Sequence, residues 1–153
     1  MEIRLTINKK TMLAKVASLT AYIGAKTTAE PEDARPTYER IATIEEDEPQ
    51  LEDFFNDCRS VITKNFIEKL TAEENLADEY TIDLRVHETF NNAILPALSE
   101  ELLSFFVNGI VARWLTITNP DNADYYFDQS LKKIDDIKNA TTCKAFTRKL
   151  YPW

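Results

Sequence analysis

Apolar residues recur every three or four positions along Phe90–Ile117, which predicts a long helix at the centre of the fold. The main row of this stretch consists of Phe90, Ile94, Leu98, Leu102, Phe105, Phe106, Ile110, Trp114 and Ile117. A second apolar row lies beside the first, so the helix is expected to be covered on more than one side. Pro96 predicts a kink or a fresh helix start, because proline lacks a backbone N–H and clashes with the preceding turn.

Two shorter stretches, Glu2–Asn8 and Glu79–Val86, alternate between apolar and polar residues, which is typical of half-buried strands. The two strands are expected to pair with each other, since a lone strand leaves its backbone groups without partners. The segment Thr71–Asp78 is polar and is expected to be a loop. The sequence therefore predicts a small two-stranded β element beside the helices.

Three further helices are predicted. The first has Thr11 as its N-cap and ends near Gly24, where a left-handed cap is expected. The second begins near Pro49 and carries the stripe Leu51, Phe54, Phe55, Cys58, Val61, Ile62, Phe66 and Leu70. The third begins at Asn119-Pro120, a cap followed by a first-turn proline. The prediction is one mainly α domain over residues 1–153, a helical bundle of about four helices with the β element.

The segment Thr27–Pro49 contains three prolines and an acidic excess without a sustained period, which predicts a long loop with an extended piece at Tyr38–Ile44. The acidic run that closes it consists of Glu45, Glu46, Asp47 and Glu48. Four adjacent carboxylates do not converge on one cation in either a helix or a strand. They are expected instead at the N-terminal end of the next helix, where the helix dipole favours negative charge.

The end of the sequence, Lys144–Trp153, mixes aromatic and basic residues. An exposed tail of this kind is costly for a monomer unless its own core or a neighbouring subunit covers it. Together with the acidic run, it is predicted to form a protein–protein interface. The predicted interface residues are Glu45, Glu46, Asp47, Glu48, Phe146, Arg148, Lys149, Tyr151 and Trp153.

Charge is distributed unevenly along the chain, whose formal net charge is −8. From Gln129 onward six basic and two acidic residues give a net +4, so the remainder carries −12. This asymmetry suits head-to-tail self-association or an acidic partner, the alternative being ordinary solvated faces. The acidic body argues against nucleic-acid binding. Without a signal-peptide pattern or an apolar run free of polar breaks such as Asn108 and Arg113, a cytoplasmic, non-membrane protein is expected.

No reactive constellation is found in the sequence. His87 is the only histidine and no nucleophile motif accompanies it, so a surface histidine is expected. Cys58 lies on an apolar helix face and is expected to be a buried free thiol. Three acidic residues that share a helix face lack the spacing and glycine of a calcium loop: Asp121, Asp124 and Asp128. We therefore expect no catalytic residues, no cofactor and no metal.

Two stretches stand out by their residues. The first is Thr20-Ala21-Tyr22-Ile23-Gly24-Ala25-Lys26. The second comprises Trp114, Asn119-Pro120, Tyr125-Tyr126-Phe127, Leu131, Ile134, Ile137, Arg148-Lys149 and Tyr151-Pro152. Together they resemble small helical virion proteins of tailed phages and prophages of Bacteroides-type bacteria, and within that group the head–tail connector (adaptor) proteins. The resemblance implies a helical protein that stacks in rings beneath a portal, with loops and a tail that grip neighbours.

Three hypotheses of function follow. The leading one is a non-enzymatic structural protein that forms a ring or other homo-oligomer and docks on virion proteins such as a portal. It would be a head–tail connector or tail-completion component, present in the host cytoplasm during assembly and then in the virion. The second is a bacterial regulatory or adaptor domain that binds a single protein partner. The third is an enzyme that uses Glu88 or the Asp121–Asp128 face.

Overall fold

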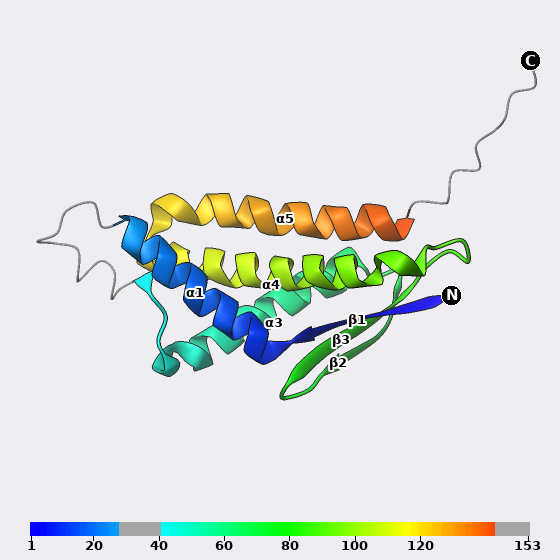
Figure 1. Ribbon diagram of the computed structural model, residues 1–153, viewed down its shortest axis with the longest axis horizontal. Coiled ribbons are helices and arrows are strands. Elements are labelled where there is room, and N and C mark those ends of the chain that lie inside the picture. The colour runs from blue at the N-terminus through cyan, green and yellow to red at the C-terminus, as the bar shows by residue number, and fades with distance from the viewer. Residues whose placement is uncertain (28–40, 143–153) are drawn as a thin grey trace, which may run out of the picture.

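The computed structural model describes residues 1–27 and 41–142, and all statements below concern these residues (Figure 1). They form four helices: α1 (Lys9–Thr27), α3 (Glu48–Asn65), α4 (Leu95–Thr118) and α5 (Pro120–Thr142). Two short 3-10 turns, η1 (Glu45–Asp47) and η2 (Asn92–Ile94), precede α3 and α4. The strands are β1 (Glu2–Asn8), β2 (Leu70–Asn75) and β3 (Glu79–Arg85). The prediction of a mainly α fold with four principal helices is confirmed.

The sheet has three antiparallel strands in the order β1-β3-β2. The predicted pairing of the first and last strands is confirmed, with Leu5 opposite Ile82 and their apolar neighbours buried on the same face. The prediction of a two-stranded element is wrong, because β2 adds an edge strand where a helix stripe ending at Leu70 and a polar loop were expected. Most of β2 is exposed, so it carries no alternation of apolar residues.

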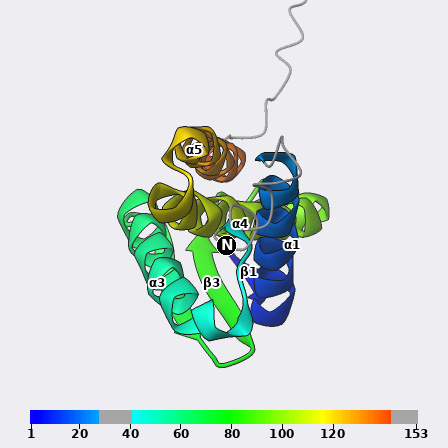
Figure 2. The same ribbon diagram turned by 90° about the vertical axis from the view of Figure 1, so that its left-hand side faces the viewer.

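Helix α4 lies at the centre of the molecule, as its apolar circumference predicted. Figure 2 shows α5 on one side of it, α3 and α1 flanking it, and the sheet on the side away from α5. An aromatic cluster joins three of these elements, since the rings of Phe55, Tyr80 and Phe106 lie with centroids 5.0–5.4 Å apart. This contact holds α3, β3 and α4 around one core.

The ends of α4 differ from the predicted stretch Phe90–Ile117. Pro96 falls in the first turn of the helix, so it marks a fresh start and not a kink. Before it, the side chain of Asn91 accepts a hydrogen bond from the Ala93 N–H at 3.0 Å and caps η2. Ile117, which was expected in the buried row, is 65% exposed because it faces outward in the last turn.

Both predicted ends of α1 are wrong. The Asn8 side chain accepts a hydrogen bond from the Thr11 N–H at 3.0 Å, so Asn8 and not Thr11 caps the helix. The helix continues through Gly24 to Thr27, and neither described glycine has a positive φ. Glycine inside a helix costs roughly 1 kcal/mol, which tertiary contacts readily offset, so its position alone does not end a helix.

One described segment, Asn92–Thr118, is long and apolar enough to cross a membrane by length and composition alone. It contains α4, and half of its apolar window is buried inside the fold. The central helix of a soluble protein passes the same test, so this segment is weak evidence for a membrane span. The expected absence of a membrane span stays a prediction.

Candidate interaction surface

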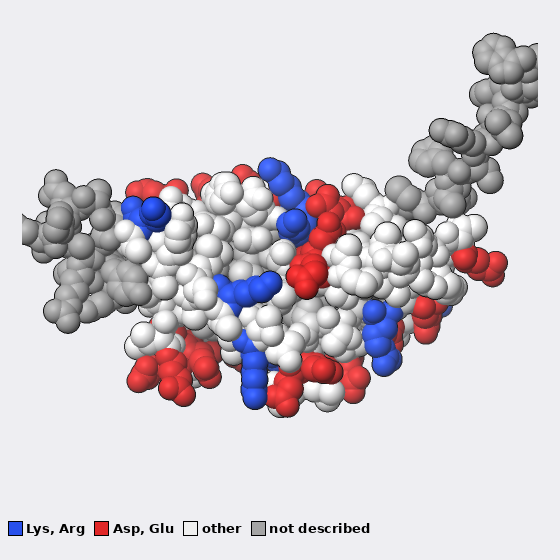
Figure 3. Space-filling view, in the orientation of Figure 1, with Lys and Arg blue, Asp and Glu red and all other residues white. Residues whose placement is uncertain are grey.

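The acidic run lies where the sequence predicted it, at the N-terminal end of a helix. Glu45, Glu46 and Asp47 form η1, which leads directly into α3 at Glu48. Asp47 is used locally, because its carboxylate accepts a hydrogen bond from the Ile44 N–H at 2.9 Å. The three glutamates are exposed and make no ion pair within the part of the chain that the structure describes. Figure 3 shows acidic side chains gathered over η1 and the start of α3.

Two hydrogen bonds fix the segment that precedes η1 against the helices. The indole Nε1 of Trp114 donates to the Ile41 carbonyl at 2.6 Å, and Ile41 itself is fully buried. The Thr43 N–H donates to the hydroxyl of Thr20, a buried residue of α1, at 3.2 Å. The end of the predicted loop Thr27–Pro49 is therefore part of the core, and it holds η1 beside α1.

A groove of about 350 Å³ lies between α1 and the η1–α3 segment. We call it the α1–α3 groove; it is lined by Lys10, Leu13, Ala14, Ala17, Thr43, Ile44, Glu45, Glu48 and Leu51. The lining includes the small side chains of Ala14 and Ala17 on the α1 side and the buried side chain of Leu51 on the α3 side. Ile44, which is 60% exposed, stands on its edge. The groove lining thus combines apolar side chains with two carboxylates.

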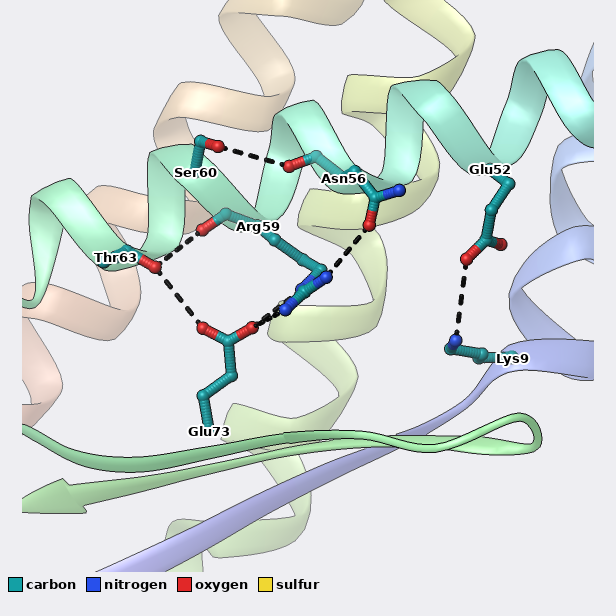
Figure 4. A network of polar contacts seen from close by, with 7 residues as sticks. All are labelled: Lys9, Glu52, Asn56, Arg59, Ser60, Thr63 and Glu73. Atoms are coloured by element: carbon teal, nitrogen blue, oxygen red, sulfur yellow. Dashed lines mark hydrogen bonds and ion pairs between the residues drawn. The ribbon is translucent and has the colours of Figure 1, made fainter.

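An ion pair outside the groove lining also joins the start of α1 to α3. Lys9, which is almost fully buried, places its Nζ 3.8 Å from a carboxylate oxygen of Glu52 and 4.9 Å from the ring centroid of Phe55. Figure 4 shows this contact between the start of α1 and the first turns of α3. Lys9 lies outside the groove lining, whose basic residue is Lys10 on the α1 side.

A second polar network connects α3 to the edge strand β2 (Figure 4). The guanidinium of Arg59 donates to Glu73 at 2.7 Å through Nε and to the Asn56 side-chain oxygen at 3.0 Å through Nη1. The same guanidinium lies 5.9 Å from the ring of Tyr80, whose pKa is raised chiefly by burial. The charges of Arg59 and Glu73 are paired with each other. This network therefore holds the edge strand β2 against α3 and covers the core.

A tyrosine cluster lies where the end of α1 meets the start of α5. Tyr22, Tyr125 and Tyr126 line a hollow of about 430 Å³, and the Lys26 Nζ lies 5.7 Å from the Tyr22 ring. Burial raises the pKa of Tyr126, and the neighbouring Tyr125 and Tyr22 raise it further. Hydrophobic periodicity did not single out this surface, because Tyr22 and Tyr125 lie on the solvent side of their helices, while the half-buried Tyr126 packs against the core.

The residues weighed for chemistry do not come together. His87 is exposed and its Nδ1 lies 2.8 Å from the Thr89 hydroxyl. The prediction of a buried free thiol at Cys58 is confirmed, and burial raises the pKa of that thiol to about 11. Within residues 1–27 and 41–142, no group of three His, Cys, Asp or Glu side chains could hold a metal ion. Asp121 and Asp124 lie in the first turns of α5, and Asp128 follows one turn later.

Part of the predicted interface falls outside the described residues. These are Phe146, Arg148, Lys149, Tyr151 and Trp153 of the tail. The first three residues of the extended piece predicted over Tyr38–Ile44 also lie outside the described residues. Of the nine predicted interface residues, the described ones are the four acidic residues that form η1 and begin α3.

Comparison of this chain with models of protein families, with curated proteins and with solved structures gives no match.

Proposed function

We propose that this protein is a non-enzymatic assembly protein that associates with further copies of itself and docks on neighbouring proteins. The observation that carries the proposal is a set of exposed large apolar side chains toward one end of the molecule. Its members, each at least 60% exposed, are Tyr22, Ile44, Ile117 and Tyr125. They come from the end of α1, the segment before η1, the end of α4 and the start of α5, which lie toward the same end in Figure 1.

Exposed tyrosines and aliphatic residues that gather in one region are typical of protein–protein interfaces, where aromatic side chains carry much of the binding energy. We call this set the apolar end. It borders the acidic residues of η1, so the same region offers both apolar anchors and charge. Such a mixture suits an interface that must be specific for its partner.

The chemistry of the described residues supports a structural role. Burial raises the pKa of the Cys58 thiol to about 11, which disfavours the nucleophilic thiolate form further. The Arg59–Glu73 pair saturates its own charges at the edge of the sheet. In this proposal these polar groups stabilise the fold, and the exposed apolar end binds other proteins.

The resemblance to head–tail connectors supports a virion as the place of this assembly. We propose that in a virion the protein is a helical bundle, that its copies form a ring, and that a portal is its neighbour. A gene neighbourhood with portal, terminase and capsid genes would support it. A neighbourhood of regulatory genes would favour the alternative, a bacterial adaptor domain that binds one protein partner.

The proposal is tested by sedimentation of the protein over a concentration series, with electron microscopy of the largest species. We expect concentration-dependent association that weakens in the variant Tyr22→Ser/Tyr125→Ser. Leu131→Ser is the matched control, since Leu131 is also a large exposed apolar residue but lies further along α5. A protein that stays monomeric at every concentration contradicts self-association, and equal effects of the two variants would contradict the role of the apolar end.

A further inference from the structure

We propose that the α1–α3 groove binds the segment Lys144–Trp153 of a second copy of this chain, so that copies join head to tail. This inference rests on the proposed function and names the occupant of one surface. The groove belongs to the described structure, and the occupant is a segment of the same sequence that follows α5.

Charge complementarity is the first argument. The groove lining carries two carboxylates, Glu45 and Glu48, against one basic residue, Lys10, and Glu46 is exposed one residue away. None of the three glutamates has an ion-pair partner among the described residues. The tail carries three basic residues and no acidic residue between positions 144 and 153: Lys144, Arg148 and Lys149. Opposite charges arranged in this way steer association and fix its register.

The shape of the groove is the second argument. Its volume of about 350 Å³ is near the lower end of the range for binding pockets, so it has room for a few side chains and not for a folded element. Its apolar surface comes from Leu13, the two alanines and the exposed edge residue Ile44. The tail offers matching anchors at intervals of one to four residues, namely Phe146, Leu150, Tyr151 and Trp153.

The length of the tail favours a second copy over the chain's own groove. Figure 1 places η1 and the start of α3 toward the opposite end of the molecule from Thr142, where α5 ends. A helix of the length of α5 spans roughly 34 Å at 1.5 Å per residue. Residues 143–153 span at most about 40 Å when fully extended. A tail that returned along α5 would therefore have few residues left to occupy its own groove.

A groove on one copy and a tail on the next form a heterologous interface, in which the two contacting surfaces differ. Repetition of such a contact closes into a ring or continues as a filament, depending on the rotation between copies. The same geometry explains why the acidic body and the basic end of this sequence are separated along the chain. Both are needed on every copy if each copy is to bind one neighbour and be bound by another.

The test uses two full-length variants with reversed charges. One is the groove variant Glu45→Lys/Glu48→Lys, and the other is the tail variant Arg148→Glu/Lys149→Glu. Each variant alone brings like charges together, and we expect its self-association to weaken at least about tenfold. In an equimolar mixture every tail again meets an oppositely charged groove, so association is expected to recover to within about threefold of the unmodified protein.

The matched control for charge is Glu79→Lys/Glu88→Lys, which changes the net charge equally at two exposed positions outside the groove. Thermal unfolding of each variant checks that the fold is retained. For a groove variant that does not fold, Ala14→Leu provides a second one, since it fills the groove without changing its charge.

Recovery in the mixture supports a groove that binds the tail of another copy, because a tail in its own groove gains nothing from mixing. Absence of recovery, or an effect of the groove variant no larger than that of the control, overturns the inference. The proposed function survives that result if the unmodified protein self-associates and the groove variant does so with the same affinity. A protein that is monomeric under all conditions overturns both.

Discussion

Helix α3 meets its neighbours in two places where small residues face it, and the two contacts have opposite characters. In its middle, α3 packs against Gly109 of α4 so closely that a Cβ added there would lie 2.8 Å from the Cys58 Sγ and 3.2 Å from the Ser130 Oγ. At its start, α3 faces Ala14 and Ala17 of α1 across the open α1–α3 groove. Small side chains permit a close approach at the first place, which we call the closed contact. At the second place, which we call the open contact, they leave a hollow.

The difference between the two contacts depends on which segment faces the small residues. Gly109 faces two regular helices, because Ser130 of α5 also donates a hydrogen bond to the Phe105 carbonyl of α4 at 3.2 Å. The alanines of α1 face a segment whose position is set by other contacts, those of Trp114 with Ile41 and of Thr20 with Thr43. A small residue therefore marks close packing only where the facing helix is free to approach it. Where the facing segment is held in place by other contacts, a small residue marks a candidate binding surface.

The largest effect is expected from Trp114→Ala, which acts on the core and on the segment that leads to the groove. Trp114 is buried, and its indole holds the carbonyl of Ile41 behind the groove. Removing a buried large aromatic side chain costs about 3–5 kcal/mol. We expect that loss of unfolding free energy in urea denaturation, together with weaker self-association because η1 is no longer fixed. A midpoint equal to that of the unmodified protein would show that Trp114 is not part of the core.

The next effect is expected from Gly109→Ala, which tests the closed contact. Overpacking a core costs about 1–3 kcal/mol, and alanine recovers up to about 1 kcal/mol in helix propensity, so a net loss of about 1–2 kcal/mol is expected. The double variant Gly109→Ala/Cys58→Ala removes the sulfur that the new methyl group meets. It should cost less than the sum of the two single variants in urea denaturation, and simple additivity would contradict the close contact.

The sequence predicted the core well and the groove poorly, for physical reasons. Periodicity identified α4 and the buried faces of β1 and β3, because burial repeats with the period of the element. It missed β2, whose edge position leaves it exposed, and it missed the close packing at Gly109, because the chain carries no sign of what lies opposite a glycine. The position of Glu45 and Glu48 at a helix start was predicted correctly, and their role in an interface stays a prediction. The groove beside them depends on contacts over more than twenty residues, such as that of Thr20 with Thr43, which no local pattern encodes.

A smaller effect is expected from pH at the closed contact. Burial raises the pKa of the Cys58 thiol to about 11, whereas an unfolded thiol has a pKa of roughly 8.5. The folded state holds this proton more tightly, so the contribution of the thiol to stability is complete below the unfolded pKa and is lost as the pH rises toward 11. At pH 9.5 the unmodified protein should lose about 1 kcal/mol more than Cys58→Ala does, relative to pH 7.

Urea denaturation of both proteins with a reductant present measures this difference. The comparison of two variants cancels the titration of other groups, since lysines and tyrosines ionise in both. Parallel losses in the two proteins would mean that the thiol of Cys58 is accessible to solvent in the folded state.

The smallest effect on stability is expected from Ala14→Leu, which adds a side chain to the open contact. Ala14 lies on the exposed side of α1 and lines the groove, so a leucine there meets free space and keeps good helix propensity. The unfolding free energy should change by no more than about 0.5 kcal/mol, as for an ordinary surface substitution. Self-association should nevertheless weaken, because the new side chain occupies the space proposed for the aromatic tail. Sedimentation and urea denaturation of the same preparation separate the two readouts, with Ser18→Leu as a control on the exposed surface of α1 outside the groove. If Ala14→Leu destabilises the protein as much as Gly109→Ala does, the groove is closed in solution and the two contacts are alike.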